Sequence, residues 1–303
     1  MGAIKLSLSD KAFNTVNITL ITILTIIMIY PLYFVLIASV SEPYDVVNGS
    51  VFLFPSGFTL EAYENVFKES RLWLGYRNTL FYTVFGTLFA LFLTLPSAYV
   101  LSKKKLVGRN LFAVYFIIPM YFGGGLIPTY LQVRGMGLLD KPYTLIILGS
   151  LSVYNVIVTR VFFQTSIPEE IYESAYLDGA SEIRMFLQIA LPLSKPIIAV
   201  MALFYAVGRW NDYSTALIYT SKADYLPLQM VLRGILLMNQ KVMEAINEKN
   251  LDIKIILDLS RLALIAEAMK YSMIFIASAP LLIAYPFVQK YFVKGIMIGS
   301  LKG

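Results

Sequence analysis

Five consecutive residues, the RWNDY stretch at 209 to 213, hold the clearest binding chemistry of this sequence because they lie inside a long apolar segment. A tryptophan ring can stack on a sugar ring, and a guanidinium or amide group can bond its hydroxyls or a carboxylate. Charged residues within a membrane span usually face a water-filled cavity or the bundle interior. We therefore predict that these residues line a pathway for a polar solute: Arg209, Trp210, Asn211, Asp212 and Tyr213. The alternative is a belt of aromatic and basic side chains at the lipid headgroups.

Arg209 and Asp212 also form a candidate charge pair. They are three residues apart in the sequence, a spacing that puts both side chains on one face of a helix. Each can therefore offset the charge of the other within the apolar segment.

A second polar stretch, SIPEEIYESAYLDGASEIRMFLQIALP at 166 to 192, separates two apolar segments. Ser166 and Glu169 have the spacing of a capping box, which predicts a helix start. Gly179 can adopt the left-handed conformation that ends a helix, and either Asp178 or Ser181 can cap a second helix. The pattern predicts two short helices that meet at Gly179, with Pro192 ending the second; a plain interfacial loop helix is the alternative.

The composition excludes most enzyme chemistry. The chain has no cysteine and no histidine, which excludes thiol nucleophiles, disulfides, thiolate or imidazole metal sites and imidazole bases. It also lacks the Gly-Lys-Ser or Gly-Lys-Thr of a phosphate-binding loop. We therefore predict a noncatalytic chain with no catalytic or metal-binding residues and no cofactor of its own. Its net charge of +6 comes from residues scattered between apolar runs, which does not indicate nucleic-acid binding.

Hydrophobic residues make up 58% of the chain and charged residues 15%, against about 25% charged residues in soluble domains. This composition predicts an all-α polytopic membrane protein that forms a single domain over residues 1 to 303. Six segments reach the about 20 apolar residues that a spanning helix needs: 14 to 40, 77 to 101, 109 to 132, 142 to 165, 194 to 218 and 271 to 293. The first is longer than the core of a signal peptide, so we interpret it as a retained helix. Pro119 and Gly123 to Gly125 interrupt the third.

The charge of one short connector predicts the orientation. Lys103, Lys104, Lys105 and Arg109 lie between the second and third segments, and such short basic connectors mark the cytoplasmic side. Six passes then put both termini in the cytoplasm. The longer connectors, residues 41 to 76 and 219 to 270, are expected outside, and connectors of that length are usually functional or mobile.

Part of the hairpin resembles the EAA motif of permease subunits in binding-protein-dependent ABC importers. That motif runs Glu-Ala-Ala, three residues, Gly, nine residues, Ile, one residue and Leu-Pro. The residues that match it in register are Glu173, Ala175, Gly179, Ile189, Leu191 and Pro192. Ser174 replaces the first alanine of the motif.

This resemblance implies a type I ABC importer permease fold in which the hairpin is a cytoplasmic coupling helix. It implies that the following residues face a partner ATPase: Glu173, Ser174, Ala175, Asp178, Gly179 and Ala180. Glu173 would pair with a basic residue of that ATPase, and the small Ala175 and Gly179 would permit close approach.

Other stretches are similar to the MalG-like, sugar-importing branch of these permeases. Its Trp-Asn-acid segment resembles residues 209 to 213. Permeases for polysaccharide fragments and oligo-uronates resemble residues 121 to 130, 135 to 140 and 285 to 295. This similarity implies an oligosaccharide cargo, with an acidic one such as an alginate oligomer favoured, and adds Tyr121 and Phe122 to the candidate pathway residues.

The resemblance thus implies a multi-pass permease subunit in the bacterial plasma (inner) membrane. Its expected partners are a second homologous permease, two ATPase subunits that use ATP and Mg, an extracytoplasmic solute-binding protein, the oligosaccharide and the lipid bilayer. Two other classes stay open: a secondary transporter of a polar solute driven by an ion gradient, for which Asp212 is the candidate intramembrane carboxylate, and a structural or signalling subunit.

Overall fold

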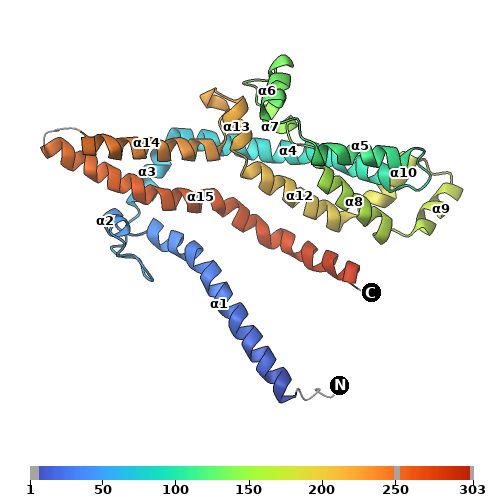
Figure 1. Ribbon diagram of the computed structural model, residues 1–303, viewed down its shortest axis with the longest axis horizontal. Coiled ribbons are helices and arrows are strands. Elements are labelled where there is room, and N and C mark those ends of the chain that lie inside the picture. Colours follow the sequence, from blue (N-terminus) through green and yellow to red (C-terminus); the bar gives the residue numbers. More distant parts are fainter. Residues whose placement is uncertain (1–6, 249–252, 301–303) are drawn as a thin grey trace. The chain divides into compact units, whose positions relative to one another are not determined.

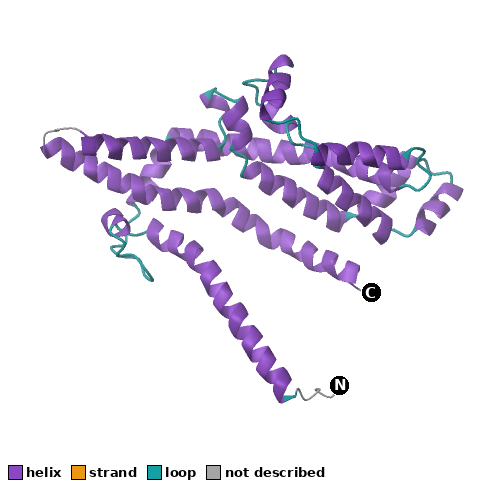
Figure 2. Ribbon diagram, viewed as in Figure 1, coloured by secondary structure: helices purple, strands orange, loops and turns teal. Residues whose placement is uncertain are grey.

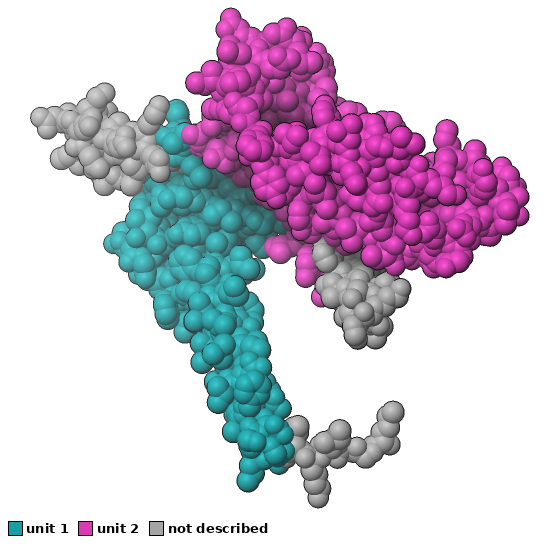
Figure 3. All heavy atoms as spheres, turned by 45° about the vertical axis from the view of Figure 1, so that its right-hand side comes forward, with its two compact units in different colours: residues 1–69, 234–278 teal, residues 70–233, 279–303 magenta. Residues whose placement is uncertain are grey.

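The computed structural model describes residues 7 to 248 and 253 to 300. Throughout these ranges the chain forms helices joined by loops, with no strand (Figure 1, Figure 2). The predicted all-α fold is therefore confirmed. Two compact units are distinguished in Figure 3: residues 1 to 69 with 234 to 278, and residues 70 to 233 with 279 to 303.

Within the described residues, three helices are long and apolar enough to cross a membrane by themselves. They are α1 (Leu8–Ser39), α4 (Ser70–Ser102) and the Ala263–Pro286 stretch of α15 (Ile253–Ser300). They overlap the first, second and sixth predicted segments. Ser7 caps α1, because its side chain accepts the backbone N–H of Asp10 while the Asp10 carboxylate accepts that of Ser7.

Two further pairs of helices meet the length and apolarity requirements only together, because each is bent. Helices α5 (Arg109–Tyr121) and α6 (Leu126–Gly135) meet at 112°, across the glycines that the sequence marks as an interruption. Residues Glu182–Leu193 and α12 (Lys195–Trp210) meet at 81°. Counting each pair as one span gives five spans among the described residues, so the predicted count of six stays a prediction.

The fourth and fifth predicted segments are not continuous helices. The fourth contains α7 (Thr144–Ile147) and α8 (Val153–Ser166), separated by Gly149 in a left-handed conformation with φ of 69°. The fifth continues beyond α12 into α13 (Ser214–Tyr219). These breaks leave backbone carbonyls and amides for side chains to satisfy.

The unit that contains residues 1 to 69 has its own small core. Ile37 and Ala38 of α1 pack with Val46 of α2 (Pro43–Val47) and with Val51. Tyr63 attaches the short helix α3 (Glu61–Lys68) to this core: its hydroxyl is hydrogen-bonded to the hydroxyl of Ser39 on α1, and its ring contacts that of Phe275 on α15. Helix α14 (Leu228–Glu248) lies within the long connector at 219 to 270.

The unit that contains residues 70 to 233 is a bundle in which α4 packs on α8 and α12, and α5 packs on α8 (Figure 1). Thr94 of α4 and Tyr205 of α12 join their hydroxyls at 2.7 Å in the interior. Helices α9 (Glu169–Leu177) and α10 (Glu182–Met185) lie at one end of this bundle, whereas α6, α7 and α13 gather away from them (Figure 1).

Candidate functional site

The turn of the hairpin at residues 166 to 192 follows from one glycine. Helix α9 ends at Leu177, and Gly179 takes the left-handed conformation with φ of 77°. The Gly179 N–H donates to the carbonyl oxygen of Tyr176 at 3.0 Å, and the Ala180 N–H donates to that of Ala175 at 2.9 Å. These two bonds form a Schellman motif, so the predicted turn at Gly179 is confirmed.

The second half of the hairpin starts at Ser181. Its hydroxyl accepts the backbone N–H of Arg184 at 3.3 Å and caps α10. Asp178, the other candidate cap, is instead the C-cap residue of α9. The chain continues through the π-helical turn η1 (Phe186–Ala190) and α11 (Leu191–Leu193), and it bends at Ser194 rather than at Pro192.

The predicted capping box at Ser166 is wrong. Ser166 is the last residue of α8, and α9 begins at Glu169 with Pro168 at its N-cap and no side-chain cap bond. An N-cap residue needs a non-helical backbone, which Ser166 does not have because α8 runs through it.

Most of the predicted coupling residues lie on the surface of the hairpin. Glu173, Ser174, Asp178 and Gly179 are exposed, and Ala180 is half-buried. Ala175 is only 9% exposed, so within this chain it packs inward.

The tip of the hairpin also exposes three large apolar side chains that the sequence reasoning did not select: Tyr176, Leu177 and Ile183. Leu177 is 86% exposed. We call these three residues the tip patch. Ile183 is 72% exposed and lies on α10.

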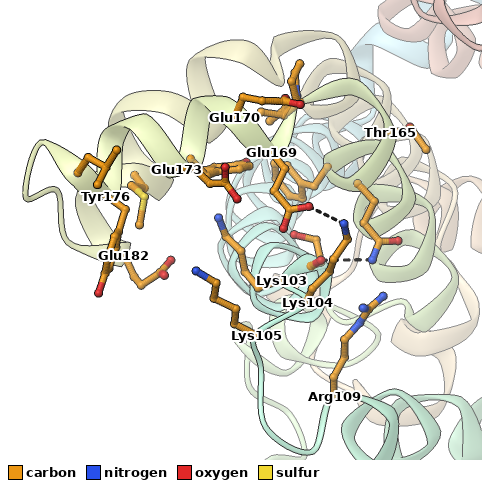
Figure 4. Close-up of a pocket in the computed structure, with 18 residues that line it drawn as sticks. Lys103, Lys104, Lys105, Arg109, Thr165, Glu169, Glu170, Glu173, Tyr176 and Glu182 are labelled. Atoms are coloured by element: carbon orange, nitrogen blue, oxygen red, sulfur yellow. Dashed lines mark hydrogen bonds and ion pairs between the residues drawn. The ribbon is translucent and has the colours of Figure 1, made fainter.

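A charged crevice of 950 Å³ lies between this hairpin and the basic connector that follows α4 (Figure 4). The lysines at 103 to 105 face the acidic side chains of α9 across it. Lys104 Nζ lies 2.5 Å from Glu169 Oε2. This hydrogen bond raises the pKa of Lys104 and lowers that of Glu169. Both side chains are exposed, so solvent screens their attraction.

A second cavity, of 580 Å³, lies at the other predicted site. Its lining includes Arg209 and Asp212, two of the predicted pathway residues. The other polar side chains that line this cavity are Thr129, Ser152, Asn155, Tyr205, Thr215 and Tyr219.

Arg209 directs its guanidinium group into the protein. Nη1 donates to the carbonyl oxygen of Leu145 at 2.8 Å, and Nη2 donates to the carbonyl oxygen of Ile146 at 3.0 Å and to Ser150 Oγ at 2.9 Å. The side chain is 8% exposed and passes over Gly86, where a Cβ atom would lie 3.0 Å from Nε. Arg209 thus fastens the end of α7 to α12 against α4.

Asp212 does not share a helix with Arg209, because α12 ends at Trp210. The Asp212 carboxylate accepts the backbone N–H of Thr215 at 3.0 Å, at the start of α13. Its charge still acts on Arg209. The predicted charge compensation is therefore present, although the predicted helix face is not.

The remaining pathway candidates are placed elsewhere. Trp210 is 4% exposed and contacts the Tyr76 ring of α4 edge-on at 6.1 Å between centroids. Asn211 is exposed and donates from Nδ2 to the carbonyl oxygen of Val207 at 3.0 Å. Tyr213 is exposed beneath the guanidinium group of Arg233.

Tyr121 and Phe122 stand at the bend between α5 and α6, where both are exposed. Neither is among the residues that line the two cavities described above.

The sequence reasoning missed Tyr205 and Asn155 as cavity residues. Tyr205 lies four residues before Arg209, which places both on one face of α12, and this spacing was an available signal. Asn155 is buried in α8.

A carboxylate clamps two loops that flank this cavity region. Asp140, in a left-handed conformation with φ of 56°, accepts the Ser221 N–H at 2.6 Å and the Ser221 hydroxyl at 2.8 Å. These bonds, together with that from the Lys222 N–H, lower the pKa of Asp140. The loop after α6 is thereby attached to the loop after α13.

Comparison with known proteins gives consistent results. The family model described as "Binding-protein-dependent transport system inner membrane component" matches residues 72 to 298. Protein LplC of Bacillus subtilis (strain 168) is 40% identical over 97% of this chain and 96% of its own length. The polygalacturonan/rhamnogalacturonan transport system permease protein YtcP of the same organism is 36% identical over 90% of this chain and 92% of its own length.

A solved structure is also similar over nearly the whole chain. It is a chain in the crystal structure of a bacterial ABC transporter involved in the import of the acidic polysaccharide alginate. The TM-score is 0.84 and the sequence identity 32%, covering 96% of this chain and all of that chain.

Proposed function

The chain belongs to the family of binding-protein-dependent transport system inner membrane components and is a noncatalytic permease subunit of a carbohydrate ABC importer; from this premise, we propose how it is driven and what it carries. Its cargo is an acidic oligosaccharide delivered by an extracytoplasmic solute-binding protein. Its hairpin transmits force from two ATPase subunits that bind ATP and Mg. A second homologous permease completes the translocation pathway.

One observation carries the coupling part of this proposal: the hairpin presents an apolar tip beside acidic side chains. The tip patch exposes Tyr176, Leu177 and Ile183, and Glu173 is exposed on the same hairpin. Exposed apolar residues with charged neighbours are typical of a surface that docks into a partner's groove. In this proposal the tip patch enters a groove of the ATPase and Glu173 pairs with a basic residue there.

Ala175 acts differently from its neighbours. Because it is buried within this chain, its small side chain serves the internal packing of α9 rather than the contact with the ATPase. Gly179 serves the turn, since a Cβ atom there would meet nothing within 4 Å and only its backbone conformation is demanding. The hairpin is thus a preformed lever.

In operation, closure of the ATPase pair on ATP moves this lever. Rocking of one helix bundle against another around a central site is the motion expected for alternating access. The basic connector at 103 to 109 and the hairpin then lie in the cytoplasm with both termini. The connectors at 41 to 76 and 219 to 270 meet the binding protein outside.

The cavity of 580 Å³ supports a polar cargo. Asn155, Tyr205 and Thr215 supply groups that can bond sugar hydroxyls, and Arg209 adds positive charge. The names of YtcP and of the alginate transporter both refer to polysaccharides, and alginate is named there as an acidic polysaccharide. An acidic oligosaccharide is the cargo that these observations favour together.

Gly179→Pro tests the coupling. Proline fixes φ near −65° and has no N–H, whereas Gly179 has φ of 77° and donates to Tyr176. We expect the assembled complex to insert in the membrane but to lose ATP hydrolysis stimulated by loaded binding protein. Gly179→Asn is the matched control, because asparagine tolerates the left-handed conformation. Normal stimulation in Gly179→Pro would refute the coupling role.

Reconstituted vesicles test the cargo. With the binding protein present, uronate oligomers are expected to stimulate ATP hydrolysis and to be transported, whereas neutral oligosaccharides of the same length are not. Transport of the neutral oligomers alone would refute an acidic cargo while leaving the permease function unchanged.

A further inference from the structure

The hairpin is joined by the chain itself to α8 and to the helices that follow it, but α4 lies far from it in the sequence. Any motion of the hairpin therefore reaches α4 only through side-chain contacts. Helix α4 also packs on α8 and α12, and its direct attachment to the hairpin determines how rigidly the end of α4 follows the hairpin.

Lys103 provides the most direct attachment. It follows the last residue of α4, and its Nζ lies 3.2 Å from the ring centroid of Tyr172 on α9 and 4.4 Å from that of Tyr99 on α4. The two rings meet edge-on at 6.1 Å. One ammonium group thus contacts two aromatic rings that belong to the two elements to be joined, a geometry in which cations bind ring faces.

Tyr99 extends this attachment to the rest of the hairpin. Its side chain is 4% exposed and packs on Phe163 of α8 and Phe186 of η1, with centroids at 5.9 and 5.0 Å. Its hydroxyl donates to Glu182 Oε2 at 3.2 Å. Tyr99 therefore contacts both halves of the hairpin, while the pair of Lys104 and Glu169 adds an exposed ion pair beside it.

Stability alone does not account for the ammonium group at this position. Burial is the main influence on Lys103 and lowers its pKa, against the opposing attraction of Glu182 and Glu169. A half-buried cation therefore carries a desolvation cost that a methionine of similar length would not. Its directional contact with two rings gives a reason for retaining it.

We propose that Lys103 is a positioning residue that locks the hairpin to the end of α4 by contacting Tyr99 and Tyr172 together, so that α4 moves with the hairpin as one body. This inference rests on the proposed coupling function. It assigns to the basic connector a mechanical role in addition to its effect on membrane orientation.

The test uses the complete complex with its ATPase, second permease and binding protein in vesicles. The chain has no cysteine, so a spin-label pair at Val100→Cys on α4 and Glu170→Cys on α9, both exposed, reports the distance between the helix and the hairpin. With Lys103 present we expect one narrow distance distribution in all nucleotide states. In Lys103→Met we expect a broadened distribution that changes on nucleotide binding, and a fall of about 5-fold or more in stimulated over basal ATP hydrolysis.

Lys103→Arg retains a cation that binds aromatic rings and is expected to restore both readouts. Tyr172→Leu, which removes one ring, should reproduce the effect of Lys103→Met. Lys195→Met removes an exposed lysine at the start of α12 and is expected to leave both readouts unchanged.

A narrow distribution in both Lys103→Met and Tyr172→Leu would overturn the lock. A complex in which loaded binding protein does not stimulate ATP hydrolysis even with Lys103 present would overturn the proposed coupling function instead. The distance distribution in Lys103→Met would still decide the lock in that case.

Discussion

Replacing Arg209 with methionine removes a guanidinium group that joins three helices of the permease. The hydrogen bonds lost run to the carbonyl oxygens of Leu145 and Ile146 and to the hydroxyl of Ser150. Methionine is shorter than arginine, but its side chain extends to about the position of Nε and can therefore still cover Gly86. The substitution therefore tests the hydrogen bonds more than the packing.

The expected magnitude follows from these three bonds. A hydrogen bond from a charged donor contributes about 1.5–3 kcal/mol to stability. Part of this sum is offset, because methionine does not carry the desolvation cost of about several kcal/mol for a buried ion. We expect a net loss of about 2–4 kcal/mol. If half of that loss appears in the unfolding barrier, the half-life of the folded complex at a fixed temperature falls by about 5- to 30-fold.

The assay is the thermal inactivation half-life of the purified complex, measured at one temperature for each variant. Arg209→Lys should give an intermediate value, because one ammonium group cannot reach all three acceptors with the geometry of a guanidinium group. Arg134→Met is the control, since it removes an exposed arginine from α6. An unchanged half-life in Arg209→Met would refute the structural role inferred here.

The same variants separate this role from direct cargo binding. If Arg209 mainly bound the carboxylate of the cargo, Arg209→Met would weaken transport of acidic oligomers without shortening the half-life. We expect instead that Arg209→Met shortens the inactivation half-life and lowers transport of every oligomer that the parent complex carries, acidic and neutral alike.

Two further substitutions test the polar contacts around the cavity. Asp140→Asn should loosen the loop clamp to Ser221. Because the bonds of this clamp lower the pKa of Asp140 below its usual 3.8, the clamp should be complete above that pH and be lost as the pH falls below it. Hydrogen exchange of residues 219 to 223 measures both effects. Equal exchange in variant and parent would contradict this. Tyr205→Phe removes a hydroxyl that bonds Thr94 at 2.7 Å and accepts the Ser152 N–H at 3.3 Å, so the inactivation half-life should shorten by an amount equivalent to about 1–2 kcal/mol; no change would contradict that contribution.

The hairpin was the part of the site most predictable from sequence, because its turn is a local event. Gly179 reaches the left-handed conformation with bonds to residues within five positions along the chain. The helix start was misassigned for an equally local reason: Ser166 fits an N-cap pattern, but α8 extends through it. Spacing alone does not tell where the preceding helix ends.

The cavity was less predictable, because its residues are brought together by packing between helices. Arg209 was predicted to line a solute pathway, because a charge within a span usually faces a cavity or the bundle interior; it lies at the cavity, with its guanidinium group bonded within the protein. Its acceptors lie 59 to 64 residues away in the sequence, in a segment that was expected to be a continuous helix. A continuous helix satisfies its own carbonyl groups, so no pattern in the sequence indicated that an arginine would be needed there.

The break between α7 and α8 therefore bears on two predictions: the continuous helix at 142 to 165 and the role of Arg209 in the pathway. Because α7 ends at Ile147, just before Gly149 in its left-handed conformation, carbonyl oxygens of α7 are left without helical partners. Arg209 satisfies them and so cannot offer those donors to cargo. The polar groups left facing the cavity, such as those of Asn155 and Thr215, are consequently better placed than Arg209 to distinguish one oligosaccharide from another. Mutational searches for cargo selectivity should start from them.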